Sequence, residues 1–282
     1  MPAPITLFVH AKPDHATAAL DALKQCELAD QSYLTVFCDG PSGPDEQDGV
    51  DRVRAIARNT VGFKHLDVVE FAKHKGRSQL IYDAVSQITS SHGKVIVVED
   101  NLIVSPYFLQ YINDGLDKYA TNESVVSICG YSYRSQSDLP ETYFLPGAHS
   151  WGWATWRRGW GLFRSDADAL VKDITEQGLI YAFDSGGAEP LTQSLSESTH
   201  NDESWWSLCW MASAILADKL TLYPGRSLVA HRDYSDKATA VAPVIKSSLS
   251  SDGVRVEQIP IEVNDDLMRE LKASFLTWRG AR

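Results

Sequence analysis

The chain has 282 residues, of which 44% are hydrophobic and 22% are charged, a balance typical of a globular protein. Its 37 acidic residues outnumber its 26 basic residues, and the net charge is −11. Nucleic acid is therefore not expected as the main partner, because phosphate backbones bind surfaces rich in Lys and Arg. A small diphosphate is compatible with this charge, because a bound metal ion can neutralise it locally.

Strand-like and helix-like segments alternate through the first 130 residues. The expected strands, each a run of apolar residues, are 5–9, 33–38, 66–71, 95–98 and 125–129. The expected helices, each with apolar residues at helical spacing, are 14–24, 49–58, 78–90 and 106–119. This alternation predicts an α/β fold in three layers with a mostly parallel central sheet.

The rest of the chain is less regular. Residues 131–150 and 184–204 are expected to form long loops, which in compact domains are often functional. A helix is expected over 205–216 and a short strand over 220–223. Residues 235–253 are rich in Ser, Ala and Lys, and we expect a mobile connection there.

A capped amphipathic helix is expected over residues 264–278. Its apolar residues share one stripe: Leu267, Leu271, Phe275 and Trp278. We expect this stripe to pack on the domain itself. The alternative is a peripheral contact with a membrane surface or a partner, helped by Arg279 and Arg282.

The four cysteines are scattered and show no CxxC spacing, so they predict neither a zinc site nor a dense disulfide framework. The N-terminus lacks the basic and apolar segments of a signal peptide, and no run of about 18 apolar residues is present. A reducing, cytoplasmic location is therefore expected, with any membrane contact peripheral.

The clearest functional signal is the segment Lys94-Val-Ile-Val-Val-Glu-Asp-Asn101, a buried strand that ends in polar residues. Ligands of open α/β sheets bind at the carboxyl ends of strands, and acidic oxygens there suit a cation such as Mg²⁺ or Mn²⁺. The alternative is a polar turn in which Asp100 or Asn101 caps the next helix.

All eight tryptophans lie between residue 151 and the C-terminal helix. Core packing explains Trp210, which lies one helical turn after Trp206. Trp151 and Trp153 flank a glycine beside His149, and aromatic faces in such a loop can also line a ligand pocket.

Five segments, taken in chain order, resemble bacterial GT-A-type glycosyltransferases, and in particular the N-acetylglucosaminyltransferase I-like group. They are the first strand with His10, Cys38-Asp39-Gly40, Gly76-Arg77-Ser78, the Glu99-Asp100-Asn101 segment with its Ser105-Pro106, and Ser150-Trp-Gly-Trp-Ala-Thr-Trp156. The resemblance implies a GT-A-like catalytic domain over residues 1–240. Its nucleotide-sugar half would be about 1–105 and its acceptor half 106–240, with 241–282 as connection and C-terminal helix.

The resemblance implies transfer of a hexosyl or N-acetylhexosaminyl group from a nucleotide sugar, with UDP as the expected nucleotide, to a hydroxyl of a glycan or glycolipid. Inversion at the anomeric carbon, assistance by Mn²⁺ or Mg²⁺ and a role in polysaccharide biosynthesis are implied too. The implied donor-binding residues are His10, Asp39, Arg77, Glu99, Asp100 and Asn101. The implied metal ligands are Asp100, Asn101 and His231.

One position departs from the family pattern. Asn101 stands where the family commonly has a second Asp, and its amide oxygen can ligate a cation only without charge. Metal binding is therefore expected to be weaker, and an inactive site is an alternative.

An inverting transferase needs a general base, and the best match is Asn201-Asp202-Glu203-Ser204. Glu203 is preferred over Asp202, and the alternative for both is capping of the following helix. His149, Trp151 and Trp153 are the expected acceptor-binding residues. Arg77 at a helix N-terminus could assist the diphosphate, whereas Lys73-His74-Lys75 is expected to be a solvated loop.

The sequence leaves two other functions open and disfavours a third. A nucleotidyltransferase would share the layered sheet and acidic site, but no glycine-rich loop follows the first strand. A non-catalytic sugar-binding relative would tolerate Asn101. An NAD-dependent oxidoreductase is disfavoured by the lack of a GxGxxG motif after that strand.

Overall fold

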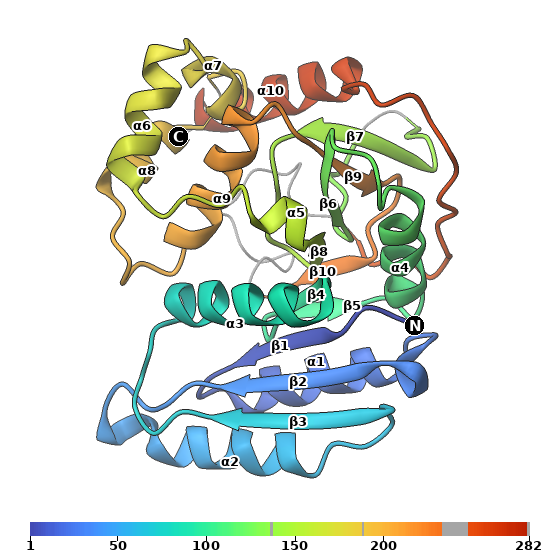
Figure 1. Ribbon diagram of the computed structural model, residues 1–282, viewed down its shortest axis with the longest axis vertical. Helices are drawn as coiled ribbons and strands as arrows, with labels where there is room; N and C mark the ends of the chain where they lie inside the picture. Colours follow the sequence, from blue (N-terminus) through green and yellow to red (C-terminus); the bar gives the residue numbers. More distant parts are fainter. Residues whose placement is uncertain (136–137, 188, 233–247, 281–282) are drawn as a thin grey trace.

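The computed structural model describes residues 1–135, 138–187, 189–232 and 248–280 (Figure 1). Its centre is an eight-stranded sheet with the strand order β3-β2-β1-β4-β8-β6-β9-β7. The first four strands along the chain are β1 (Ile5–Val9), β2 (Tyr33–Cys38), β3 (His65–Glu70) and β4 (Lys94–Glu99). They are parallel to one another and confirm the strands predicted for this half.

The order of these strands creates a topological switch. Strand β2 lies on one side of β1 and β4 lies on the other, with Ile5 beside Leu34 on one edge and beside Ile96 on the other. The chain therefore winds in opposite directions away from β1. In open α/β sheets, a crevice for ligands opens at this point, outside the carboxyl ends of the strands.

The second half of the sheet mixes directions. Strands β6 (Val125–Cys129) and β9 (Leu220–Pro224) are parallel, whereas β8 (Trp153–Trp156) and β7 (Thr142–Pro146) run antiparallel to their neighbours. The mostly parallel sheet is confirmed, but β7 lies in the segment 131–150 that was expected to be a loop, and no strand was predicted at β8. All four residues of β8 are buried, so its sequence lacks the alternation that marks a half-buried strand.

Helices cover both faces of the sheet. One face carries α1 (Pro13–Lys24), α2 (Gln47–Arg58) and α4 (Phe108–Lys118), and the other carries α3 (Arg77–His92), α5 (Arg157–Trp160), α6 (Ala167–Glu176) and α9 (Trp205–Leu216). Strand β4 alternates between the two cores, with Ile96 and Val98 in one and Val95 and Val97 in the other. The predicted three-layer α/β fold is thus confirmed.

Two short helices complete the region beside α6. They are α7 (Ile180–Phe183) and α8 (Leu191–Glu197), and α8 lies inside the segment 184–204 that was expected to be a loop. The Asp184 carboxylate accepts hydrogen bonds from both the amide and the hydroxyl of Thr192, at 2.7 Å each. This local side-chain contact, which hydrophobic periodicity does not reveal, organises the segment before α8.

A second sheet lies beside the crevice. It pairs β5 (Leu102–Val104) with β10 (Val229–His231) in antiparallel fashion, so that His231 is opposite Leu102. The Arg232 amide also donates to the carbonyl oxygen of Asn101 at 2.8 Å. Two segments far apart in the chain therefore meet at the end of β4.

The chain then returns to the domain. Tyr119 donates a hydrogen bond to the Glu257 carbonyl at 3.1 Å, and α10 (Asp265–Gly280) packs its apolar stripe inward. Leu267, Leu271 and Phe275 are 2%, 5% and 4% exposed, which agrees with packing on the domain rather than on a membrane. The side chains of Trp278 and Arg279, the residue Arg282 and the segment 233–247 lie outside the described part.

In the described part of the chain, no helix has the length and apolar character needed to cross a bilayer.

Candidate functional site

A cleft of about 160 Å³ opens at the topological switch, at the carboxyl ends of β1 and β2. Its polar lining residues are His10, Asp39, His74, Arg77, Asn201 and Glu203. His10 follows β1 and Asp39 follows β2, while His74 and Arg77 come from the connection between β3 and α3. Polar side chains from three parallel strands thus converge on the position where ligands of such sheets bind.

The Asp39 carboxylate organises one end of this cleft. It is 4% exposed, and Oδ1 accepts hydrogen bonds from the amides of Gly40 and Lys75, both at 2.8 Å. Oδ2 accepts one from the Gly76 amide at 3.2 Å. A Cβ on Gly40 would lie 2.3 Å from the carbonyl carbon of Lys73, so only glycine allows this loop to approach so closely.

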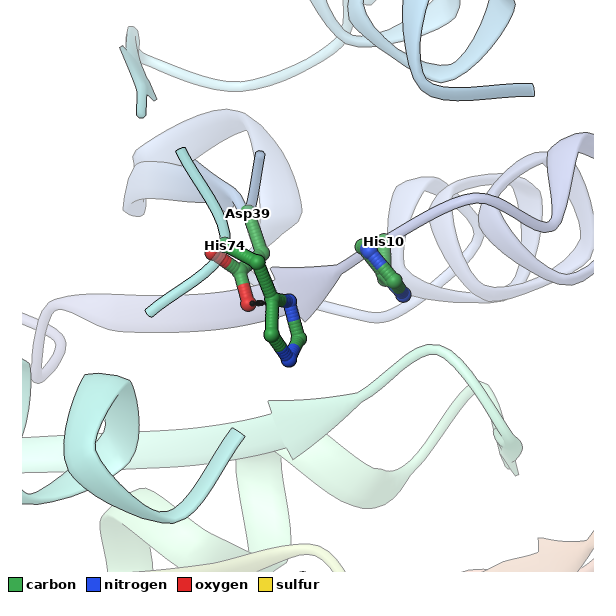
Figure 2. A group of neighbouring side chains, drawn as sticks. All are labelled: His10, Asp39 and His74. Atoms are coloured by element: carbon green, nitrogen blue, oxygen red, sulfur yellow. Dashed lines mark ion pairs between the residues drawn. The ribbon is translucent and has the colours of Figure 1, made fainter. Parts of the chain in front are cut away.

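His74 belongs to the same end of the cleft, although its sequence context suggested a solvated loop. Its Nδ1 lies 2.9 Å from Oδ2 of Asp39, and its ring centroid is 5.1 Å from that of His10 (Figure 2). The flanking Lys73 and Lys75 are exposed as expected. The sequence carries one signal for the position of His74: it follows a parallel strand, and the carboxyl ends of such strands lie at one edge of the sheet.

Among the described residues, His10, Asp39 and His74 form the group of histidine, cysteine and acidic side chains that could hold a metal ion. Their candidate ligand atoms lie within 4.8 Å of one another. However, Nε2 of His10 is 3.0 Å from the Gly40 carbonyl oxygen, and both oxygens of Asp39 already accept backbone hydrogen bonds. These contacts fit a preformed polar pocket at least as well as a cation site.

Arg77 occupies the other end of the cleft, at the first residue of α3. Its guanidinium nitrogens lie 3.4 Å from Glu99, 3.7 Å from Asp100 and 3.7 Å from Glu203. The predicted donor-binding residues Arg77, Glu99 and Asp100 are therefore brought together. One guanidinium faces three carboxylates, so the cluster favours an additional cation.

The two carboxylates at the end of β4 are strongly buried. Burial raises the pKa of Glu99 to about 7, and the nearby Arg77 opposes this shift. Burial likewise raises the pKa of Asp100, again opposed by Arg77. Burial thus favours the neutral forms of both carboxyls, and a cation beside them would stabilise the ionised forms.

Asn101 supports a cation at the same place. Its amide oxygen is buried and has no hydrogen-bond partner among the described residues. Asp100 precedes it, and His231 reaches this strand end through the pairing of β10 with β5. An amide oxygen, a carboxylate and an imidazole are all known ligands of divalent cations.

The two candidate bases differ in their surroundings. Oδ2 of Asp202 accepts hydrogen bonds from the amide and hydroxyl of Thr199, at 2.6 and 3.1 Å, and so stabilises its own turn. The Glu203 side chain is 77% exposed, lines the cleft and lies beside Arg77. Glu203 is therefore better placed to meet a substrate than Asp202.

The predicted acceptor-binding residues separate into two groups. His149 and Trp151 are partly exposed and line a second cavity of about 180 Å³. Trp153 has no exposed surface and stacks in the core against Trp206, with ring centroids 5.7 Å apart. The strand β8 explains this difference, because it turns Trp153 toward the core helix α9.

Comparisons with known proteins leave the function open. No protein-family model matches the sequence, and no curated protein matches it. The structure is similar to S. aureus TarS, with 13% identity and a TM-score of 0.45 over 81% of this chain and 36% of that one. This chain thus spans about a third of that protein's length.

Two further solved structures show weaker similarity. One is glucosyl-3-phosphoglycerate synthase from Mycobacterium tuberculosis with Mn²⁺, UDP-glucose and phosphoglyceric acid, at 13% identity and a TM-score of 0.34, covering 63% of this chain and 67% of that one. The other, from Bacillus anthracis, is described as a glucose-1-phosphate thymidylyltransferase with sucrose, at 11% identity and a TM-score of 0.33, covering 60% and 74%. Similarity at this level concerns the fold alone.

Proposed function

We propose that this protein is a GT-A-type glycosyltransferase that moves a sugar from a nucleotide diphosphate donor, with a UDP-sugar as the expected donor, to a hydroxyl of a glycan. One observation carries the proposal. A cleft at the carboxyl ends of β1 and β2 holds polar groups suited to a nucleobase, His10, Asp39 and His74. It also holds Arg77, which contacts a cluster of three carboxylates.

The donor would lie along this cleft. Asp39, with His10 and His74 beside it, would bind the nucleobase of the donor. Three backbone amides orient its carboxylate, which supports this role. The diphosphate would lie toward Arg77, at the N-terminus of α3. Helix N-termini and guanidinium groups both favour phosphate oxygens.

A divalent cation, Mn²⁺ or Mg²⁺, would be held by Asp100, Asn101 and His231. The support is the buried, unpartnered amide oxygen of Asn101 and the excess of carboxylates around Arg77. When bound, such a cation stabilises the charge that develops on a leaving diphosphate. Glu99 would contribute negative charge behind these ligands rather than ligate the ion.

Glu203 would act as the general base. The acceptor hydroxyl oxygen attacks the anomeric carbon, the bond from that carbon to the β-phosphate oxygen breaks, and the diphosphate leaves with the bonding electrons. The hydroxyl proton passes to the Glu203 carboxylate as the new bond forms. Attack from the face opposite the diphosphate inverts the anomeric carbon.

The test is binding and hydrolysis of nucleotide sugars by the full chain. Calorimetry with UDP, with and without Mn²⁺, measures the affinity that the nucleobase and diphosphate contacts provide. A thermal-shift screen over UDP-, GDP- and dTDP-sugars identifies the donor. We expect metal-dependent stabilisation by a UDP-sugar and slow release of UDP. Binding without any hydrolysis or transfer would indicate the non-catalytic relative, whereas release of pyrophosphate from a nucleoside triphosphate and a sugar phosphate would indicate a nucleotidyltransferase.

A further inference from the structure

The geometry points to the second cavity as the site for an uncharged sugar ring of the acceptor, with Tyr133, His149, Trp151, Glu189, Ser207 and Phe275 as its lining. This inference rests on the proposed function and names the acceptor class for it. The cavity has about 180 Å³, which leaves room for one sugar ring.

The cavity has a stiff aromatic wall. The His149 ring stacks on Tyr131 at 5.4 Å between centroids, and Trp151 meets Tyr131 edge to face at 4.8 Å. Tyr133 meets His149 edge to face at 5.8 Å. Rings that hold one another in this way offer a flat apolar face with little loss of side-chain freedom on binding.

Polar groups stand around this wall. The Trp151 amide donates a hydrogen bond to Nδ1 of His149 at 3.2 Å, so the proton of a neutral ring is on Nε2. Burial lowers the pKa of His149 to about 4, which keeps the ring neutral at pH 7. Ser185 donates to Glu189 at 3.1 Å, and a carboxylate can accept further bonds. Donors and acceptors thus surround an apolar face, as a polyhydroxylated ring requires.

The charge of the lining selects against anions. None of the described residues that line the cavity is a lysine or an arginine, and Glu189 is the acidic one among them. A phosphate or carboxylate on the acceptor ring would therefore be desolvated without a cationic partner among these residues. The acceptor ring is expected to be a neutral hexose or N-acetylhexosamine rather than a uronic acid or a sugar phosphate.

The position of the cavity agrees with a role in transfer. Its residues Ser207 and Leu208 lie in the first turn of α9, and Glu203 immediately precedes Ser204, the residue before that helix. On the other side, the Trp151 ring lies 5.1 Å from the His231 ring between centroids. The acceptor ring would thus lie next to both the proposed general base, Glu203, and the proposed cation site.

The C-terminal helix forms part of this site. Phe275 of α10 lines the cavity, and the turn before Glu189 packs against the same helix. A Cβ on Gly186, which has a φ of +74°, would lie 3.0 Å from the Lys272 side chain. Helix α10 therefore supports the segment that carries Glu189, so the end of the chain contributes to acceptor binding and not only to the core.

The experiment is saturation-transfer NMR on the full chain with UDP and Mg²⁺ present. The probes are methyl hexopyranosides, methyl N-acetylhexosaminides and, as the anionic counterpart, methyl glucuronide. We expect a neutral glycoside to bind and the glucuronide to bind more weakly. W151A and E189Q should each weaken that binding about tenfold, the effect of losing one aromatic or charged contact, and E189Q should leave UDP affinity unchanged.

Controls separate this inference from the proposed function. Y33A removes a partly exposed aromatic residue at the far end of β2 and should leave glycoside binding intact. UDP binding without glycoside binding, equal binding by W151A, or stronger binding of the glucuronide would each overturn the acceptor site alone. If the unsubstituted protein bound neither UDP nor the glycosides, the proposed function would be overturned together with the acceptor site.

Discussion

Nδ1 of His74 lies 2.9 Å from Oδ2 of Asp39, which joins the loop after β3 to the end of β2. The same carboxylate accepts hydrogen bonds from the amides of Lys75 and Gly76, the two residues before Arg77. Asp39 therefore holds the start of α3 and, through it, the arginine at the acidic end of the cleft. The two ends of the proposed donor site are connected by this one loop.

Asp39→Asn should weaken UDP binding at least tenfold. The substitution replaces a carboxylate by an amide that cannot accept all the hydrogen bonds at that position, and charge-assisted bonds contribute about 1.5–3 kcal/mol each. His74→Ala should weaken UDP binding by a smaller factor. Calorimetry with UDP measures both effects.

A matched control lies on β3, the strand that leads into the loop of His74. His65 and Asp67 form an exposed pair at 3.1 Å near the start of β3, away from the cleft. His65→Ala should leave UDP affinity unchanged, because an exposed pair contributes little and touches no substrate. If the unsubstituted protein, D39N and H74A bound UDP with equal affinity, Asp39 would not form part of a nucleobase-binding site.

Asn101→Asp should tighten Mn²⁺ binding about tenfold, because a carboxylate adds charge to a neutral oxygen ligand. In the metal-free protein it should lower the melting temperature, since it adds a further carboxylate beside the buried Glu99 and Asp100. Excess Mn²⁺ should restore the lost stability. Electron paramagnetic resonance titration of Mn²⁺ measures the affinity.

Asp100→Asn is the matched opposite change and should weaken Mn²⁺ binding. If N101D and D100N both bind Mn²⁺ as the unsubstituted protein does, the cation is held elsewhere. A loss of Mn²⁺ binding in H74A would then identify the group of His10, Asp39 and His74 as the metal site.

Glu203→Gln should lower kcat by about 100- to 10,000-fold, the usual effect of removing a general base. UDP affinity and the melting temperature should change little, because the side chain is largely exposed. Asp202→Asn should instead reduce the stability of its turn by about 1 kcal/mol or less and leave most of kcat, because its carboxylate bonds to Thr199. The reverse pattern of kcat values would assign the base to Asp202.

Glu99→Gln should change the pH dependence of stability in the metal-free protein. Burial raises the folded-state pKa of Glu99 from 4.5 to about 7, so the folded state binds the proton more tightly than the unfolded state. The stability linked to this proton is fully present below pH 4.5 and is lost as the pH rises through 7. E99Q keeps a neutral side chain throughout.

The measurement is urea unfolding of both proteins at several pH values. The free energy of unfolding of the unsubstituted protein should fall relative to that of E99Q between about pH 4.5 and 7. A constant difference across this range would mean that Glu99 stays ionised in the folded state. His149, whose pKa is lowered, is common to both proteins and cancels in the comparison.

Predicted and observed elements agree best where the hydrophobic pattern is regular. Strand β1 and helix α9 begin and end as expected, and α1 and α2 begin within two residues of their predicted starts. Strand β8 was missed because all four of its residues are buried, and α8 because side-chain hydrogen bonds to Asp184 organise its start. Strand β8 depends on pairing with β4 and β6, and α8 depends on a side-chain contact that hydrophobic periodicity does not reveal.

The sequence by itself determined the alternation of strands and helices, the layered fold and the polar strand ends at His10, Asp39 and Asp100, because periodicity and strand-end chemistry are local properties. Tertiary structure alone decided which of these groups meet. It set Arg77 among three carboxylates and His74 against Asp39, and it buried Trp153 while leaving Trp151 beside a cavity. These relations depend on which strands are neighbours and how distant loops pack, and no short window of sequence contains that information.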